Sequence, residues 1–301
     1  MTLLDEHIVL FRTNHGICAF KDLCIHRGSA LSLGRTLGDR IECAYHGWQY
    51  DHTGACVRIP ALPEGHSIPR KARAIAYAVR EHAGLVWVAL EPPVAAFPSW
   101  PEGCEYAGPG NRGHVVGEYS WTVGAGRAIE NYLDIAHLAF VHDGTLGRRD
   151  APLVEEHQIE QDADGFYFTY VQEEPGDPQT ASGERLDLGY YYRVPLTAHL
   201  VKTNPRGEWS CISLIAAPTT ATTSQLFLTC VRNYDPDPAT DQAINEFVDL
   251  AMRQDKAIVS SVRPEEVPVD LREELHLKIP DAAGLVLRRM LSTVERADGG
   301  V

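Results

Sequence analysis

Short alternations of apolar and polar residues, separated by turn residues, dominate the first 90 positions of the chain. Alternation with a period of two is typical of half-buried strands. It predicts strands at 8–11, 17–20, 41–44, 48–50, 77–80 and 85–89. Gly16, Asp39 and Gly54 occupy turn positions between them. We therefore expect an antiparallel β domain over residues 1–100.

The pattern changes after residue 91. Residues 92–113 are rich in proline and glycine without periodicity, which is typical of a linker or covering loop. Beyond it the sequence predicts a helix at 121–142, a series of strands over 154–233, an amphipathic helix at 240–263 and a last helix at 282–294. A second domain of antiparallel sheet and helices, class α+β, is therefore expected over residues 101–301.

Composition limits the classes of function. The 301 residues allow about two domains, and the net charge of −14 argues against nucleic-acid binding. No apolar run approaches the roughly 18 residues of a membrane span, and Asp5 and Glu6 do not fit a signal peptide. We expect a cytoplasmic protein in which most of the seven cysteines are small buried hydrophobic residues.

Two cysteine-histidine motifs give the first chemical signal. They are Cys24-Ile25-His26-Arg27-Gly28 and Cys43-Ala44-Tyr45-His46-Gly47-Trp48. Two thiolates and two imidazoles are the ligands of a [2Fe-2S] cluster in which histidines replace two cysteines on one iron. A zinc site uses the same donors, but zinc-finger spacing pairs cysteine with cysteine and histidine with histidine. The mixed spacing therefore favours a Rieske cluster bound by Cys24, His26, Cys43 and His46.

These motifs resemble those of the Rieske-type non-haem iron oxygenases, whose α subunits carry Cys-x-His-Arg-Gly and Cys-x-x-His-Gly-Trp. Respiratory Rieske proteins have similar ligands and an additional cysteine in each loop, where this chain has Ser29 and Tyr45. The resemblance extends from about residue 8 to residue 291, and the chain starts later than family members usually do. It implies an N-terminal Rieske domain followed by a helix-grip catalytic domain.

A second histidine pair lies in the segment from Glu130 to His142. His137 and His142 are five residues apart, about 140° on a regular helix, so they converge only if the helix widens or ends between them. Histidines satisfied in the core are the alternative. The pattern Asn-x-x-Asp-x-x-His-x-x-x-x-His resembles the family's iron motif. The resemblance implies that His137 and His142 are iron ligands and that Asp134 bridges to a Rieske histidine of a neighbouring subunit.

The family's third iron ligand is an aspartate on the C-terminal helix. Independently, Asp255 lies on the apolar stripe of the predicted helix at 240–263, whereas Glu246 and Asp249 lie on other faces. The other members of the stripe are Ile244, Phe247, Val248, Ala251, Ile258 and Val262. A carboxylate on a buried face needs a partner, and a cation is one. His137, His142 and Asp255 then form a 2-His-1-carboxylate triad for Fe(II) with open positions for O₂.

By this resemblance the chain is an oxygenase that uses O₂ and externally supplied electrons to hydroxylate or demethylate an aromatic, heterocyclic or natural-product small molecule. Ring cis-dihydroxylation, a Rieske electron carrier and a non-catalytic ligand-binding protein are the alternatives. We expect the pocket walls between residues 190 and 227, with Tyr191, His199 and Trp209 as candidates or as plain core or surface residues.

Partners follow from the same resemblance. A separate NAD(P)H-dependent reductase or ferredoxin would supply electrons, and a head-to-tail homotrimer would carry them between subunits. Residues 1–100 hold ten Lys/Arg against nine Asp/Glu, so the negative charge belongs to the rest of the chain. Basic residues near the cluster motifs form either a patch for an acidic electron donor or an ordinary surface. They are Arg27, Arg35, Arg40, Arg70, Lys71 and Arg73.

Overall fold

The computed structural model describes residues 1–93, 96–106, 108, 110–181 and 183–298. The chain divides into two compact units, Met1–Ala96 and Phe97–Val301. Positions 94–95, 107 and 109 of the predicted linker lie outside the described residues.

The first unit contains two antiparallel sheets. One has the strand order β1-β2-β3-β8-β9 and the other the order β4-β5-β6-β7. The strands of the first sheet are β1 (Thr2–Leu3), β2 (Glu6–Thr13), β3 (Gly16–Lys21), β8 (Ala76–His82) and β9 (Leu85–Ala89). Those of the second are β4 (Arg35–Leu37), β5 (Arg40–Glu42), β6 (Gln49–Asp51) and β7 (Cys56–Arg58), and a 3₁₀ turn covers Leu31–Leu33. The six predicted strands are present, and β1, β4 and β7 are additional.

Alternation places the core of this unit. In β2, Val9 and Phe11 point inward while Leu10 is exposed, as expected for a sheet with one buried face. Phe11 meets Phe20 of β3 edge to face, with ring centroids 5.0 Å apart. The loops that carry the cysteine-histidine motifs are anchored on this core.

The second unit is one seven-stranded antiparallel sheet with the order β10-β16-β15-β14-β13-β12-β11. The first three strands along the chain are β10 (Arg112–Trp121), β11 (Ile159–Gln161) and β12 (Gly165–Glu173). The remaining four are β13 (Arg185–Arg193), β14 (Thr197–Thr203), β15 (Trp209–Thr220) and β16 (Thr223–Arg232). The predicted series of strands over 154–233 is therefore confirmed, and β10 joins it from an earlier part of the chain.

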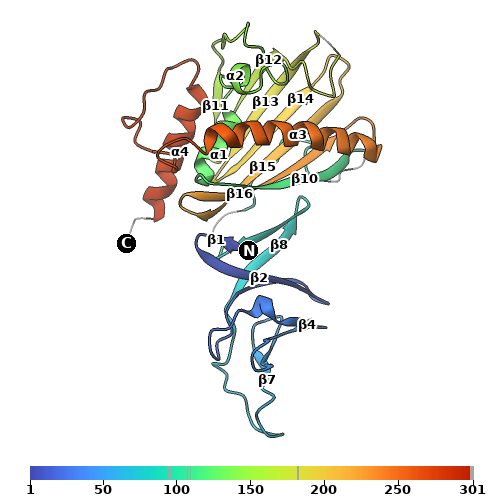
Figure 1. Cartoon of the computed structure of the whole chain (residues 1–301), viewed down its shortest axis with the longest axis vertical. Coiled ribbons are helices and arrows are strands. Elements are labelled where there is room, and N and C mark those ends of the chain that lie inside the picture. Colours follow the sequence, from blue (N-terminus) through green and yellow to red (C-terminus); the bar gives the residue numbers. More distant parts are fainter. Residues whose placement is uncertain (94–95, 107, 109, 182, 299–301) are drawn as a thin grey trace. The chain divides into compact units, whose positions relative to one another are not determined.

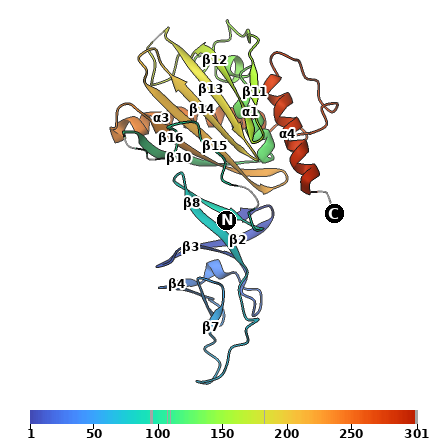
Figure 2. The same ribbon diagram turned by 180° about the vertical axis from the view of Figure 1, so that it is seen from behind.

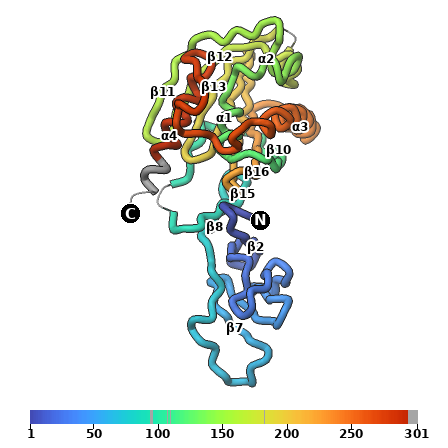
Figure 3. Tube along the Cα trace, turned by 60° about the vertical axis from the view of Figure 1, so that its left-hand side comes forward, coloured from blue at the N-terminus to red at the C-terminus, as the bar shows by residue number. Residues whose placement is uncertain are grey.

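Two helices, α1 (Ala125–Leu133) and α3 (Pro238–Val259), pack on this sheet. The short helix α2 (Leu138–Val141) contacts α3, and α4 (Ala282–Asp298) contacts α1. In Figure 1, α3 runs across the strands on the near side, and in Figure 2 the strands are in front of it. The tube view shows α1 and α4 side by side next to the same sheet (Figure 3). This arrangement agrees with the predicted helix-grip domain.

The predicted single helix at 121–142 is wrong. Trp121 still belongs to β10, α1 ends at Leu133, and the chain leaves helical geometry at Asp134, whose φ and ψ are −80° and 128°. A new four-residue helix, α2, then lies between His137 and His142. We expected either a widened helix or a helix that ends between the two histidines. The structure shows the second, because α2 ends at Val141, before His142.

The boundaries of α3 also differ from the prediction. Asp237 caps the start, where its side chain accepts a hydrogen bond from the Ala239 amide (2.8 Å). The helix ends at Val259 instead of residue 263, five residues before Pro264, and proline disfavours helical geometry in the residue before it. Ile258, assigned to the buried stripe, is 54% exposed, whereas Met252 and Val259 are buried.

Within the part of the chain that the structure describes, no helix has the length and apolar character needed to cross a membrane.

Candidate functional site: two metal-binding arrangements

The two cysteine-histidine loops have the same local geometry. In each loop the glycine amide four residues after the cysteine donates to the cysteine carbonyl: Gly28 to Cys24 at 2.8 Å and Gly47 to Cys43 at 3.0 Å. Both glycines have positive φ, 73° and 69°, which favours glycine over other residues. The repeated spacing in the sequence thus reflects two equivalent turns.

The four predicted cluster residues lie on these loops. Cys24 and Cys43 are each 2% exposed, while the rings of His26 and His46 approach to 4.6 Å between centroids. The Nδ1 atom of His26 is buried without a hydrogen-bond partner among the described residues, as expected for a nitrogen that a metal binds. The loops therefore fit a [2Fe-2S] cluster.

Two aromatic residues support the loops, and the sequence reasoning assigned neither a role. Tyr50 is fully buried, and its hydroxyl lies 3.1 Å from the Cys24 sulfur, to which it would donate when that sulfur is a cluster-bound thiolate. Burial raises the pKa of Tyr50, so the phenol keeps its proton. Trp48 stacks on His26 with ring centroids 4.5 Å apart. Hydrogen bonds to sulfur help to set the potential of iron-sulfur clusters.

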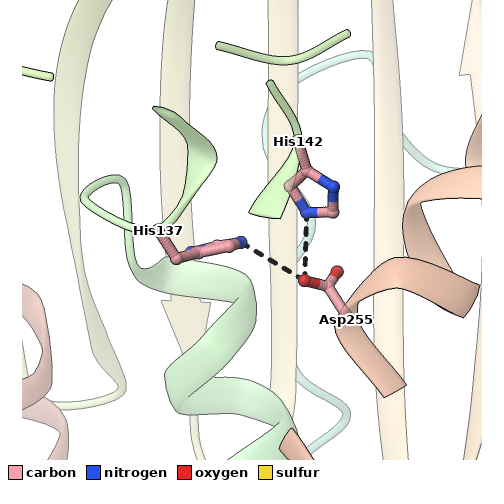
Figure 4. A group of neighbouring side chains, drawn as sticks. All are labelled: His137, His142 and Asp255. Carbon is pink, nitrogen blue, oxygen red and sulfur yellow. Dashed lines mark hydrogen bonds and ion pairs between the residues drawn. The ribbon is translucent and has the colours of Figure 1, made fainter. Parts of the chain in front are cut away.

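The second arrangement brings together His137, His142 and Asp255 (Figure 4). The Nε2 atoms of His137 and His142 lie 3.4 and 3.0 Å from Asp255 Oδ1. Among the described residues, these three form the only group of His, Cys, Asp or Glu whose donor atoms all lie close enough to bind one ion, within 4.8 Å of one another. In a Rieske cluster the two cysteines bind one iron and the two histidines bind the other. Cys24, His26, Cys43 and His46 are therefore not expected to converge on a single ion.

The outer nitrogens of both imidazoles are engaged elsewhere. The Nδ1 of His142 lies 2.8 Å from Gln254 Oε1, and the Nδ1 of His137 lies 3.3 Å from Asp134 Oδ2. Because both partners accept, each Nδ1 carries a proton, and each Nε2 faces the Asp255 carboxylate. Two imidazole nitrogens and a carboxylate that converge in this way share positive charge, either as protons or as a metal ion, so the group fits a divalent metal.

The electrostatics of the group agree with a cation. Burial alone would raise the pKa of Asp255, but hydrogen bonds with His137 and His142 lower it to about 2. Burial alone would likewise lower the pKa of His137, but Asp134 and Asp255 raise it to about 9. The site thus stabilises positive charge next to an ionised carboxylate.

Asp134 occupies the break between α1 and α2. One oxygen accepts from the Ala136 amide (2.8 Å), and the other faces His137. Its side chain is 36% exposed, so part of the carboxylate remains accessible. The sequence analysis missed Gln254. Its position next to Asp255 is the only feature of the sequence that could have indicated a role at this site.

A cavity opens next to the three residues, with about 80 Å³ of free space. Apolar side chains from α1, α2, α3 and the sheet form most of its wall. The polar lining residues are the three predicted iron ligands, Asn131, Glu174 and Lys202, together with the two phenols Tyr132 and Tyr190. A mainly apolar pocket with a few converging polar groups is typical of a small-molecule site.

The predicted wall residues Tyr191, His199 and Trp209 do not line this cavity. Strand register gives the reason: Tyr191 pairs with His199, whereas the lining residues Tyr190 and Leu200 pair with each other. Adjacent residues in a strand point to opposite faces. The three candidates therefore lie on the face of the sheet away from α3, where Trp100 contacts His199 with ring centroids 5.1 Å apart.

Comparison with known families identifies both units. Residues 1–79 match the Rieske [2Fe-2S] domain family, and residues 121–297 match the vanillate O-demethylase oxygenase C-terminal domain family. Two relatives from Pseudomonas putida are each 30% identical: methylxanthine N1-demethylase NdmA over 272 residues and methylxanthine N3-demethylase NdmB over 275 residues. Both alignments cover 89% of this chain, and they cover 75% and 76% of the relatives.

Solved structures agree with these matches. The structure of NdmA with caffeine from Pseudomonas putida aligns with a TM-score of 0.84 at 28% identity and covers 99% of this chain and 84% of that one. Dicamba monooxygenase bound to dicamba aligns with a TM-score of 0.85 at 20% identity, over 100% of this chain and 93% of that one, which shows a shared fold. The chain therefore belongs to the Rieske non-haem iron oxygenases, as an oxygenase α subunit that uses a Rieske [2Fe-2S] cluster, a mononuclear iron and O₂ to oxidise a small molecule.

Proposed function

We propose that this oxygenase removes a methyl group from a nitrogen or oxygen of an aromatic or heterocyclic small molecule. In that reaction the methyl compound, O₂, two electrons and two protons give the demethylated product, formaldehyde and water. The observation that carries the proposal is the apolar cavity that opens directly beside His137, His142 and Asp255. The activities of the relatives NdmA and NdmB, both methylxanthine demethylases, support it.

In this proposal Cys24, His26, Cys43 and His46 hold the cluster, and His137, His142 and Asp255 hold the mononuclear iron. The bound iron supplies a site for O₂ activation next to the substrate. Gln254 keeps the Nε2 atom of His142 turned toward the metal through its 2.8 Å hydrogen bond with Nδ1. The apolar walls exclude water and orient the methyl group.

Asp134 is assigned to electron transfer between subunits. Its contact with the Nδ1 of His137 supplies one half of a carboxylate bridge, and its exposed part is available to a Rieske histidine of a second subunit. His46 is exposed on its own unit, next to Tyr45, which is 63% exposed. In a closed head-to-tail homotrimer, Asp134 of every subunit can meet a Rieske histidine of its neighbour.

Other parts of the assignment are proposed with it. The Rieske domain spans residues 1–100 and the catalytic domain residues 101–301, and the division of the structure at Ala96 supports this boundary. A separate reductase or ferredoxin delivers electrons, and the six basic residues named above are exposed and available to it. The five cysteines outside the cluster motifs are buried and free, which supports a cytoplasmic location, and cell fractionation would test it.

A substrate panel with a matched product assay tests the proposed reaction. The loaded oxygenase, a reductase and NADH are incubated with N-methyl heterocycles and methoxylated aromatic compounds, and formaldehyde and hydroxylated products are measured. Formaldehyde equal to the demethylated product is the expected result. A cis-dihydrodiol without formaldehyde would indicate the dioxygenase alternative, and cluster reduction without oxidation of any compound would indicate an electron carrier.

A further inference from the structure

One lysine and two carboxylate side chains are buried together at the edge of the cavity. Lys202 Nζ donates to Glu174 Oε2 at 2.5 Å and to Asp177 Oδ2 at 2.7 Å. Their side chains are 3%, 1% and 5% exposed. Glu174 and Lys202 line the cavity, whereas Asp177 does not. We call these three residues the acid-lysine triad.

Stability alone does not account for the triad. Desolvation of buried ions offsets most of their mutual attraction, and well-packed apolar residues in their place are often as stable or more so. The surrounding wall of the cavity is mainly apolar. A charged group in such a wall fixes the orientation and chemical class of a ligand.

The charge of the triad limits which ligands it favours. Lys202 is the only Lys or Arg among the described residues that line the cavity, and two carboxylates already compensate it. No free cation on this wall is available for a substrate carboxylate. Burial raises the pKa of Glu174 to about 7, against the effect of Lys202, and Asp177 contributes in the same direction as burial. A further negative charge is therefore unfavourable here.

Glu174 also retains the capacity to accept a hydrogen bond. One of its oxygens accepts from Lys202, the other lies 3.3 Å from Gln172 Nε2, and Asp177 is a further hydrogen-bonding neighbour of the carboxyl group. A carboxylate has about four lone-pair sites. An N–H or O–H group of a substrate in the cavity is the complementary partner for the sites that remain.

We propose that Glu174, held by Lys202, selects uncharged substrates that carry an N–H or O–H donor and disfavours substrates that carry a carboxylate. The inference rests on the proposed function, because it names the substrate class of the same cavity. Glu174 is the specificity-determining residue, and Asp177 only helps to hold Lys202.

Matched pairs of probe compounds test whether the cavity prefers uncharged substrates with an N–H or O–H donor. The first pair is 2-methoxyphenol and 4-hydroxy-3-methoxybenzoate, which differ by a carboxylate, and the second is theobromine and caffeine, which differ by one ring N–H. The neutral member and the N–H member are each expected to have the higher kcat/KM for formaldehyde release. Calorimetric titration of the resting, loaded enzyme measures the same preference as binding, so the inference is tested without turnover. A carboxylate that binds as tightly as its neutral partner would overturn the inference, while formaldehyde from that carboxylate would leave the proposed function intact.

Glu174→Gln and Asp177→Asn form a matched pair of variants, because each removes one carboxylate from Lys202 but only the first lies on the cavity wall. Glu174→Gln is expected to reduce both preferences by roughly 10- to 100-fold, the scale of a hydrogen bond to a charged group. Asp177→Asn removes the same charge from the triad, so it is expected to weaken the discrimination against the carboxylate but to keep the preference for the N–H member, because Asp177 does not line the cavity. Equal loss of the N–H preference in both variants, or its loss in neither, would contradict the role of Glu174.

Far-UV circular dichroism and an iron content of about three per chain report whether each variant is folded and loaded at both metal centres. If Glu174→Gln does not fold, Glu174→Asp retains the charge with a shorter reach. It is expected to lose the preference for the N–H member of the second pair while it still disfavours the carboxylate. Retention of the N–H preference in Glu174→Asp would overturn the direct contact.

Discussion

Asp134 is the residue whose proposed role depends most on its charge. Asp134→Asn keeps the shape and one acceptor but removes the charge that orients His137 and, in the proposed trimer, a Rieske imidazole. Both metal centres should remain loaded, and an external donor should still reduce the cluster. Reoxidation of the reduced cluster by O₂ with substrate should slow by about 10²-fold, the scale of losses around metal ligands. Stopped-flow absorbance measures this rate, with the exposed Asp150→Asn as control. Reoxidation at the parent rate would show that electrons take another route.

Tyr50 tunes the cluster through its hydrogen bond to the Cys24 sulfur. The reduced cluster is more negative, so it gains more from this donor than the oxidised cluster does. If the difference is about 1 kcal/mol, Tyr50→Phe lowers the potential by about 40 mV for one electron. Protein-film voltammetry measures the shift, and Tyr45→Phe, whose ring is exposed, serves as control. An unchanged potential in Tyr50→Phe would mean that the hydrogen bond does not act on the cluster.

Residues that share a local motif could be recognised from the sequence. Of the residues that the fold brings to the site from far along the chain, Asp255 could be recognised from the apolar stripe of its helix, whereas Gln254 and Lys202 could not. The two cysteine-histidine loops and the pair His137 and His142 are visible because each motif is local. Lys202 of β14 lies 28 residues from Glu174, which directly follows β12, and nothing in the local sequence pattern joins the two residues. Gln254 was missed for a related reason, because its partner His142 is 112 residues away.

At the scale of the elements, charged groups fasten α4 and the segment before it to α1. Arg127 and Glu130 of α1 pair with Glu274 and with Arg288 of α4. Hydrogen bonds from Arg127, and then from Arg288, lower the pKa of Glu274 to about 2 although partial burial opposes this. The carboxylate therefore stabilises the fold above its ordinary pKa of 4.5, and this contribution is lost as the pH falls toward 2.

Glu274→Gln is accordingly expected to lower the free energy of unfolding at pH 7 by about 1–3 kcal/mol, allowing for partial exposure. The difference from the parent should shrink as the pH falls below about 4.5, because the protonated parent then resembles the variant. Urea unfolding between pH 7 and pH 3 measures it, and the exposed neighbour Glu273→Gln should have little effect at any pH. A difference that stays constant across this range would exclude the ion-pair explanation.

The helices also show where periodicity fails. The amphipathic pattern identified α3 and placed Asp255 on its buried face, but it extended the stripe to Ile258, which is exposed. The apolar segment at 121–142 contains no proline, so its break at Asp134 had no local signal apart from the histidine spacing. In the sheet, the alternation located the strands but did not show which face of the sheet meets α3. Tyr191, His199 and Trp209 were therefore assigned to the wrong face.

At the scale of the whole molecule, the proposed electron transfer between subunits predicts complementation. By the proposed assignment, a His46→Ala subunit should lack a working cluster, and an Asp255→Ala subunit should lack the mononuclear iron. Coexpressed in equal amounts, the two should recover about one quarter of parent activity, because one interface in four then joins an intact cluster to an intact iron site. Each variant alone should be inactive, and separately purified variants mixed without subunit exchange are the control. No activity in the coexpressed sample would contradict transfer between subunits.

Iron and acid-labile sulfide per chain, measured in the parent and in Asp255→Ala, test the two-site assignment most directly. A Rieske cluster and a separate mononuclear site predict about three irons and two sulfides in the parent. Asp255→Ala should then retain about two irons, two sulfides and the EPR signal of the reduced cluster, while oxidation of substrate is lost. Glu246→Gln, an exposed residue on the same helix, should match the parent. Three irons and undiminished turnover in Asp255→Ala would show that His137, His142 and Asp255 are not the iron site.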